Sequence, residues 1–186
     1  MSPSDLSRTD LGAAPQPVEG DHLGMTLSID ALDHENREYF AHCARHDFHL
    51  QRCLDCDLVE YPPRTACMWC GGAQLEWVAV EGKGVVYSYS EVHHAIQPAL
   101  RAHAPYLILM VELDTQRGRP GEDDGVRVGG NLVTAAGELA PSELVVQVGI
   151  GSRMRMVFSD AGEGISLPMW TLDESVEQPT PWRYRE

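Results

Sequence analysis

With 28 acidic side chains against 14 basic ones, the chain of 186 residues has a formal net charge of -14 and lacks the basic surface that binds nucleic-acid phosphates. Its 43% hydrophobic content suffices for a packed core, and it shows neither an apolar run of transmembrane length nor a secretory signal. We therefore expect a cytoplasmic protein of one domain, or one domain plus a small module, that binds neither nucleic acid nor membranes.

The N-terminal part of the sequence changes character near residue 24. Residues 1–24 are rich in Pro, Ala, Ser, Gly and Asp, a composition that predicts a disordered leader. A helix is predicted over about 30–46, where Asp30 or Asp33 can cap the first turn. The apolar side of this helix would consist of Leu32, Tyr39, Phe40 and Cys43.

Beyond residue 75 the pattern is that of strands. Apolar residues alternate with polar ones, or form short runs, in five segments: 85–90, 106–113, 126–133, 153–158 and 165–171. A short helix is expected from Pro141, before the fourth strand. Five strands with one helical insertion suit a small closed barrel of the OB type.

Four of the five cysteines form two CxxC pairs separated by ten residues. In a chain without a secretory signal, such pairs indicate a metal site rather than disulfides. Each pair makes a knuckle in which two sulfurs converge, and two knuckles give the tetrahedral four-thiolate arrangement that zinc prefers. We predict one structural zinc site at Cys53, Cys56, Cys67 and Cys70. Iron can also occupy four thiolates, and zinc is favoured because nothing nearby suggests electron transfer.

The fifth cysteine, Cys43, is flanked by His42 and His46, which are spaced i and i+4 on the predicted helix. Such a histidine pair can face one metal ion. A free cysteine is more often a small buried hydrophobic residue, and the histidines are then ordinary surface groups. The second interpretation is favoured because no carboxylate accompanies the pair at the spacing of a catalytic zinc site.

Several motifs together resemble one known family. They comprise both cysteine pairs and the segments 48–52, 61–64, 75–77, 82–88, 105–106 and 149–158. Over about residues 30–172 the combination resembles the acyl-CoA-associated zinc-ribbon/OB-fold family, long catalogued as a domain of unknown function. The acidic leader and the charged, Gly-rich segment 114–125 depart from the family pattern.

The resemblance implies a mainly β fold with an N-terminal helix, a rubredoxin-like zinc ribbon and a five-stranded OB-fold barrel. The expected organisation is a disordered leader (1–24), a helical segment (25–48), the zinc ribbon (49–74), the barrel (75–172) and a C-terminal tail (173–186).

The resemblance also implies a role. Family members look like non-catalytic partners of thiolase-superfamily enzymes, either thiolases or retro-aldolases, whose acyl-CoA site they help to form. We therefore expect an accessory subunit in a hetero-oligomer with a lipid-transfer-type thiolase or an aldolase, with steroid side-chain degradation as the favoured setting.

Little in the sequence suggests catalysis by this chain alone. It lacks the GxSxG, phosphate-loop and HExxH motifs, and we predict no catalytic residue. Arg101 and His103 lie in a long loop and are predicted to meet a CoA phosphate. Two alternatives remain open: an OB-fold module that binds single-stranded nucleic acid through stacked tyrosines, and a stand-alone acyl-CoA-binding protein.

Overall fold

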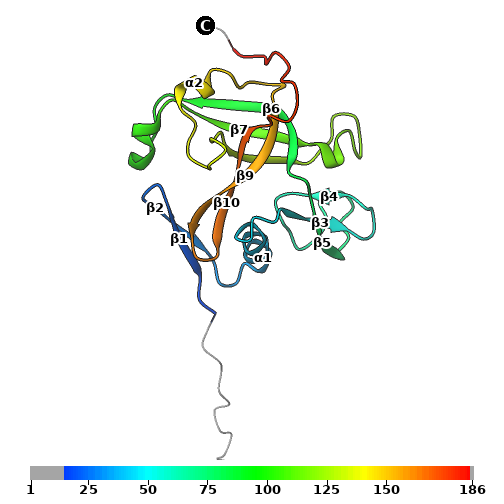
Figure 1. Cartoon of the computed structure of the whole chain (residues 1–186). Helices are drawn as coiled ribbons and strands as arrows, with labels where there is room; N and C mark the ends of the chain where they lie inside the picture. Colours follow the sequence, from blue (N-terminus) through cyan, green and yellow to red (C-terminus); the bar gives the residue numbers. More distant parts are fainter. Residues whose placement is uncertain (1–14, 185–186) are drawn as a thin grey trace, which may run out of the picture.

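The computed structural model describes residues 15–184, which form a mainly β protein with one regular helix (Figure 1). In chain order the elements are β1 (Val18–His22), β2 (Met25–Ile29), α1 (His34–Cys43), β3 (His49–Cys53), β4 (Val59–Glu60), β5 (Leu75–Ala79), β6 (Lys83–Val92), the 3-10 helix η1 (Pro98–His103), β7 (Tyr106–Leu113), the 3-10 turn η2 (Asp114–Gln116), β8 (Arg127–Asn131), the short helix α2 (Ser142–Val145), β9 (Arg153–Gly162) and β10 (Ile165–Leu172). No helix among these residues is long and apolar enough to span a membrane.

The largest sheet contains the five strands expected of the OB fold, in the antiparallel order β10-β9-β6-β7-β8. Its two outer strands curl toward each other, and Leu132 forms a single parallel bridge to Trp170. Trp170 is fully buried and its Nε1 donates to the Val128 carbonyl at 3.2 Å. The predicted barrel is therefore a strongly curved sheet. A single bridge connects its two outer edges, which are not hydrogen-bonded along their length.

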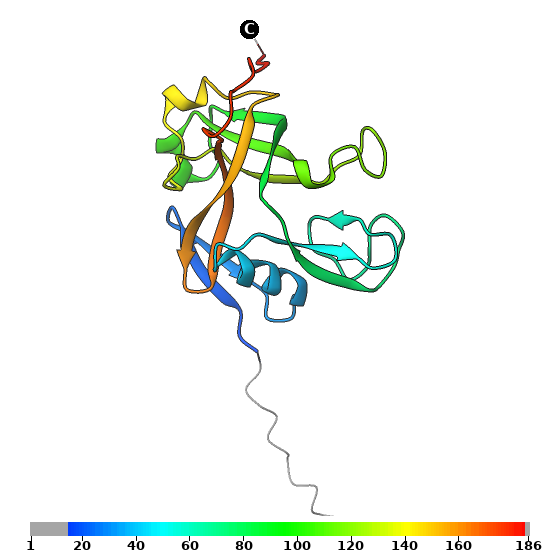
Figure 2. The same ribbon diagram turned by 45° about the vertical axis from the view of Figure 1, so that its right-hand side comes forward.

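A single hydrophobic core joins the helix, the ribbon and the large sheet. It includes Tyr39 of α1, Leu50 of β3 and Val59 of β4 together with buried residues of β6 to β10. In Figures 1 and 2, α1 lies between the β1–β2 hairpin on one side and the small ribbon sheet, β4-β3-β5, on the other. The ribbon thus completes a core that it could not form alone.

The helix begins where the sequence predicts a cap. Asp33 Oδ1 accepts the Asn36 backbone N–H at 3.1 Å, which satisfies a free donor of the first turn. The helix ends at Cys43 rather than near 46, and His46 has a positive φ of 55°. A side chain rarely adopts this left-handed conformation within a helix, so the chain turns there toward β3.

The sequence predicts a disordered leader over residues 1–24, but residues 18–24 belong to a hairpin in the structure. Residues 1–14 lie outside the described residues. Residues 18–29 form the β1–β2 hairpin, with Leu23 and Gly24 as its two-residue turn at φ 54° and 78°. Two positive φ values suit the twist of a tight hairpin. The hairpin docks on β9, where a side chain at Gly20 would meet the Ala161 carbonyl oxygen at 2.4 Å.

The C-terminal tail is also anchored. Trp182 pairs with Ile150 in an antiparallel bridge, and the Arg183 guanidinium donates to the Val145 and Val148 carbonyls and to Glu91. This tail lies at the opposite end of the molecule from α1 (Figure 1).

Candidate metal site

The two CxxC segments fold into matching knuckles. In the first knuckle, Asp57 N donates to the Cys53 carbonyl and Cys53 N donates to the Leu58 carbonyl. In the second, Gly71 N donates to the Cys67 carbonyl and Cys67 N donates to the Gly72 carbonyl. The residue after each second cysteine has a positive φ, 57° at Asp57 and 79° at Gly71. Each loop therefore turns back over its own pair of sulfurs.

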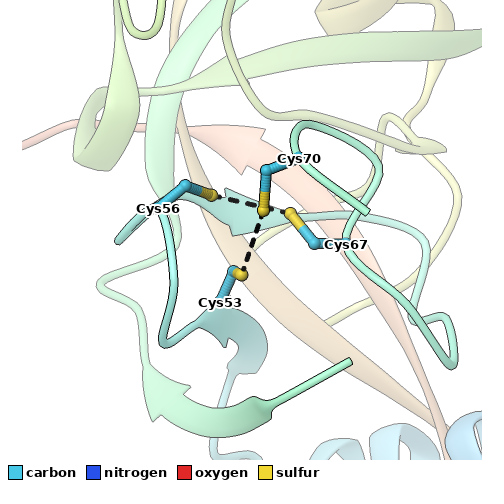
Figure 3. A group of neighbouring side chains, drawn as sticks. All are labelled: Cys53, Cys56, Cys67 and Cys70. Atoms are coloured by element: carbon cyan, nitrogen blue, oxygen red, sulfur yellow. Dashed lines mark hydrogen bonds between the residues drawn. The ribbon is translucent and has the colours of Figure 1, made fainter. Parts of the chain in front are cut away.

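The knuckles bring the four thiols together (Figure 3). The sulfurs of Cys53 and Cys70 are 3.6 Å apart, as are those of Cys56 and Cys67, and all four lie within 4.8 Å of one another. A disulfide requires about 2.05 Å. Four sulfurs around Zn²⁺ at about 2.3 Å are separated by about 3.8 Å in a regular tetrahedron, so the cluster fits a four-thiolate zinc site.

Backbone donors support the sulfurs. Trp69 N lies 3.4 Å from Cys67 Sγ, and Gly72 N lies at the same distance from Cys70 Sγ. Glycine suits position 72, because a Cβ there would lie 3.2 Å from Cys53 Sγ and would displace the end of the exposed Asp55 side chain. With four protein ligands the site offers no position for water or substrate, which is typical of structural zinc.

Two buried polar side chains hold the second knuckle and the segment before it, and neither was predicted from the sequence. Glu60 is 1% exposed and its Oε2 accepts the Met68 N–H at 2.7 Å. Gln51, also buried, accepts the Arg64 N–H at 2.6 Å. A charged residue within a two-residue strand gives no periodic signal, so only the folded loop reveals its role.

Cys43 is a buried free thiol, in keeping with the favoured interpretation. Burial raises the pKa of this thiol to about 12. His46 turns away from His42, stacks on Phe158 and bonds Asp160 at 2.7 Å, so the two histidines do not face one ion.

His42 instead approaches Asp47 and His49, with ligand atoms within 4.8 Å. Its ring stacks on His49 at 4.0 Å, and Arg45 Nη2 lies 2.9 Å from His42 Nδ1. The positive charge of the Arg45 guanidinium beside His42 disfavours the binding of a metal cation at this group.

The two residues predicted to meet a CoA phosphate both lie on the 3-10 helix η1. Arg101 and His103 are both exposed on η1. His103 lines a hollow of about 660 Å³ with Asp21, Glu138 and Asp160, whose carboxylates would repel a phosphate; Arg101 is not among its lining residues.

A closed four-cysteine ribbon joined to an OB-type sheet defines a zinc-ribbon/OB-fold protein. Two adjacent family models match the chain: the rubredoxin-like zinc ribbon domain of ChsH2 at residues 40–76 and the C-terminal OB-fold domain of ChsH2 at residues 77–159. The chain belongs to this family, the ChsH2 or DUF35 family of zinc-ribbon/OB-fold proteins.

Similar proteins include a chain of an aldolase structure and a scaffold protein. A solved structure described as the Ltp2-ChsH2(DUF35) aldolase matches with a TM-score of 0.59 and 28% identity, over 77% of this chain and 98% of that chain. A DUF35 domain-containing scaffold protein of Methanocaldococcus jannaschii is 29% identical over 115 residues, which is 61% of this chain and 72% of the relative.

A probable enoyl-CoA hydratase alpha subunit of Thermomonospora curvata is 29% identical over 140 residues. These residues amount to 75% of this chain and 38% of that relative. The present chain thus spans well under half of the longer protein.

Proposed function

We propose that this chain is a non-catalytic scaffold subunit that binds a thiolase-fold enzyme, either an aldolase or a thiolase, and helps to form its acyl-CoA site. The observation that carries the proposal is the match to a chain of the Ltp2-ChsH2(DUF35) aldolase structure, 98% of which this chain covers. The two ChsH2 family models match the ribbon and most of the OB-type sheet, over residues 40–76 and 77–159, so the likeness is not confined to the cysteine motif.

The zinc has a structural role in this proposal. Cys53, Cys56, Cys67 and Cys70 supply four thiolates, and the ion supplies the charge that keeps them deprotonated and together. The chain's own residues then hold the ribbon on the shared core. The metal takes no part in the reaction, because every position around it belongs to the protein.

The acyl-CoA site is proposed to lie between the two subunits, with the bases that bind phosphate supplied mainly by the partner. The acidic balance of this chain, 28 acids against 14 bases, supports that division. On this chain Arg101 is the candidate phosphate contact, because it is exposed on η1 outside the carboxylate-lined hollow. His103 is a weaker candidate, since it lines that hollow.

The substrate is proposed to be the CoA ester of a steroid side chain, cleaved by a retro-aldol reaction in the partner. The name of the ChsH2-containing structure supports an aldolase, and the name of the Thermomonospora relative supports an acyl-CoA setting. By analogy with symmetric thiolase dimers, we propose an assembly of two scaffold and two enzyme subunits.

The test is co-expression of this chain with the Ltp2-type thiolase-fold protein of the same organism. We expect a stoichiometric complex on size-exclusion chromatography. We further expect cleavage of a steroidal β-hydroxyacyl-CoA by the complex, with no turnover by this chain alone. Robust cleavage by the purified single chain, or no complex with the Ltp2-type protein, would contradict the proposal. A short-chain β-hydroxyacyl-CoA, run in parallel, tests the substrate class.

A further inference from the structure

Large apolar side chains gather on one face of the protein. On the outer surface of the large sheet, Tyr87, Ile108 and Met110 are 52%, 44% and 41% exposed, and on the adjoining tail Trp182 and Tyr184 are 60% and 73% exposed. We call these five residues the apolar face. Grouped exposure of this kind is unusual on a surface that meets only water, whereas single exposed apolar residues are common.

The face is hollowed along its length. A mostly apolar groove of about 460 Å³ lies between Tyr87, Ile108 and Met110, and small residues of the neighbouring strands, Ser88, Ser90 and Gly129, leave room for it. A second hollow of about 570 Å³ includes Trp182 and Tyr184. Ser88 and Tyr89 line both hollows, so the two lie next to each other on this face.

A bulge in β6 contributes to this surface. The pairing register of β6 with β7 shifts between Val86 and Ser88, so that Tyr87 is the extra residue and lies outside the core that buries Val86. Bulges often re-aim a side chain in this way. Tyr87 is then covered on one side by the Arg127 guanidinium, 3.7 Å from the ring centroid.

The two arginines at the face are already neutralised. Arg127 donates to the Glu112 carboxylate at 3.0 Å, and Arg183 donates to Glu91 at 2.5 Å. Neither guanidinium is therefore a free charge for a phosphate chain, and stacking tyrosines alone do not make a nucleic-acid groove. Arg, Tyr, Trp and Met are instead the residue types that are enriched in protein–protein interfaces.

The rim of the face is acidic. Arg127 also donates to the Asp123 carbonyl at 2.7 Å, which places the loop with the exposed side chains Glu122, Asp123 and Asp124 beside Tyr87. An apolar centre with an acidic rim is complementary to an apolar segment flanked by lysine or arginine.

We propose that the apolar face is the docking surface for the thiolase-fold subunit, which contacts it through an apolar segment with a basic rim. This inference rests on the proposed function and adds to it the surface and the chemistry of the contact. The β7–β8 loop, which departs from the family pattern, then contributes charge at the edge of the interface.

The test measures binding of the full-length, zinc-loaded chain to the Ltp2-type protein of the same organism by calorimetry. Ile108→Glu and Met110→Glu place a charge in the centre of the face, and Glu122→Lys with Asp123→Lys reverses the rim. The matched control is Leu32→Glu, at an apolar side chain that is 72% exposed between β2 and α1. Circular dichroism and one zinc per chain establish that each variant is folded.

We expect at least tenfold weaker binding for each centre variant, weaker binding for the rim variant, and no change for the control. Binding by the wild type should also weaken as salt rises. If the centre variants bind like the wild type, the face is not the docking surface, although the proposed function stands. If the wild type itself does not bind, the proposed function fails.

Two other occupants are tested with the same proteins. Binding of an oligo-dT strand at low salt that Ile108→Glu abolishes would assign the face to nucleic acid. Self-association of the wild type that the same variant abolishes would assign it to a second copy of this chain. Either result overturns the inference.

Discussion

Gln116 and the Val59 backbone exchange two hydrogen bonds across the junction between the large sheet and the ribbon. Val59 N donates to Gln116 Oε1 at 2.6 Å, and Gln116 Nε2 donates to the Val59 carbonyl at 3.0 Å. Val59 lies on β4, the outer strand of the ribbon sheet. The buried amide therefore acts as a substitute for a further strand at this edge. Trp69 Nε1 donates to the same carbonyl, so the second knuckle is tied to the junction.

Replacing Gln116 with Leu should lower the free energy of unfolding by about 1–3 kcal/mol, because the buried Val59 N–H loses its acceptor. Urea denaturation of the zinc-saturated protein measures the change. Gln147→Leu is the control, since this exposed amide bonds only within the α2 region. A difference within about 0.5 kcal/mol, as at ordinary surface positions, would show that the clamp does not stabilise the fold.

Replacing Glu60 with Ala should accelerate transfer of zinc to a competing chelator. The carboxylate holds the Met68 N–H next to Cys67, and partners just outside the ligand shell typically change metal affinity by about 10–100-fold. Release is followed with a chromogenic chelator. Glu60→Gln retains an acceptor oxygen and should fall between Ala and the wild type, and Glu81→Ala, at an exposed carboxylate, should release zinc at the wild-type rate. Equal rates for all four proteins would refute a role for Glu60.

Serine at Cys53 or Cys67 should abolish stoichiometric zinc and, with it, soluble protein or complex formation. The ribbon shares its core with the large sheet, so loss of the metal reaches beyond the knuckles. Zinc content and the yield of the co-expressed complex are the measurements, with Cys43→Ala as a variant that keeps its zinc. A Cys67→Ser protein that retained fold and complex but lost turnover would point to a chemical role for the metal instead.

The Cys43 thiol should not react with Ellman's reagent in the native protein. Its raised pKa of about 12 leaves a thiolate fraction of about 10⁻⁴ at pH 8, and the side chain is fully buried. Labelling should require global unfolding, and Cys43→Ala should give the same native time course as the wild type. A rapidly reacting thiol that is missing from Cys43→Ala would contradict this.

Asp114 should titrate below its ordinary range. Its carboxylate is held by the Arg153 guanidinium, which lowers the pKa of Asp114, with further attraction from Arg117 and Lys83. A lowered folded-state pKa gives stability that is complete above about pH 5 and is lost as the pH falls through the unfolded-state pKa and then the folded-state pKa. Because both side chains are partly exposed, we expect only about 0.5–1 kcal/mol at neutral pH. NMR titration should show the Asp114 pKa rising in Arg153→Met, and an unchanged pKa would contradict the pairing.

The zinc ribbon and the five strands could be predicted because their signals are local. Cys53 and Cys67 each open a CxxC segment of fixed spacing, and the strands alternate or run apolar over several residues. The β1–β2 hairpin was missed because its strands carry Glu19, Asp21 and Ser28, and its turn at Leu23-Gly24 resembles an ordinary loop. Its stability depends on contact with β9, which no local pattern records.

The same limit applies to side chains whose partners are far away in the sequence. Gln116 stands 57 positions from Val59, and His46 stands 114 from Asp160. Nothing in the spacing of either residue indicates the contact. Closeness in sequence can also mislead. Arg101 and His103 are two residues apart, but only His103 lines the hollow that also includes Asp21 and Asp160.

The contact between Gly20 and Ala161 constrains the order in which the protein can fold during its synthesis. The strand that receives the hairpin is β9, the second-to-last strand in the chain. β1 and β2 therefore leave the ribosome long before the strand on which they pack has been made. At about 5–20 residues per second, that interval is on the order of ten seconds. During this time the β1–β2 hairpin has no β9 to pack on, and it can dock only after the β9–β10 hairpin has been translated.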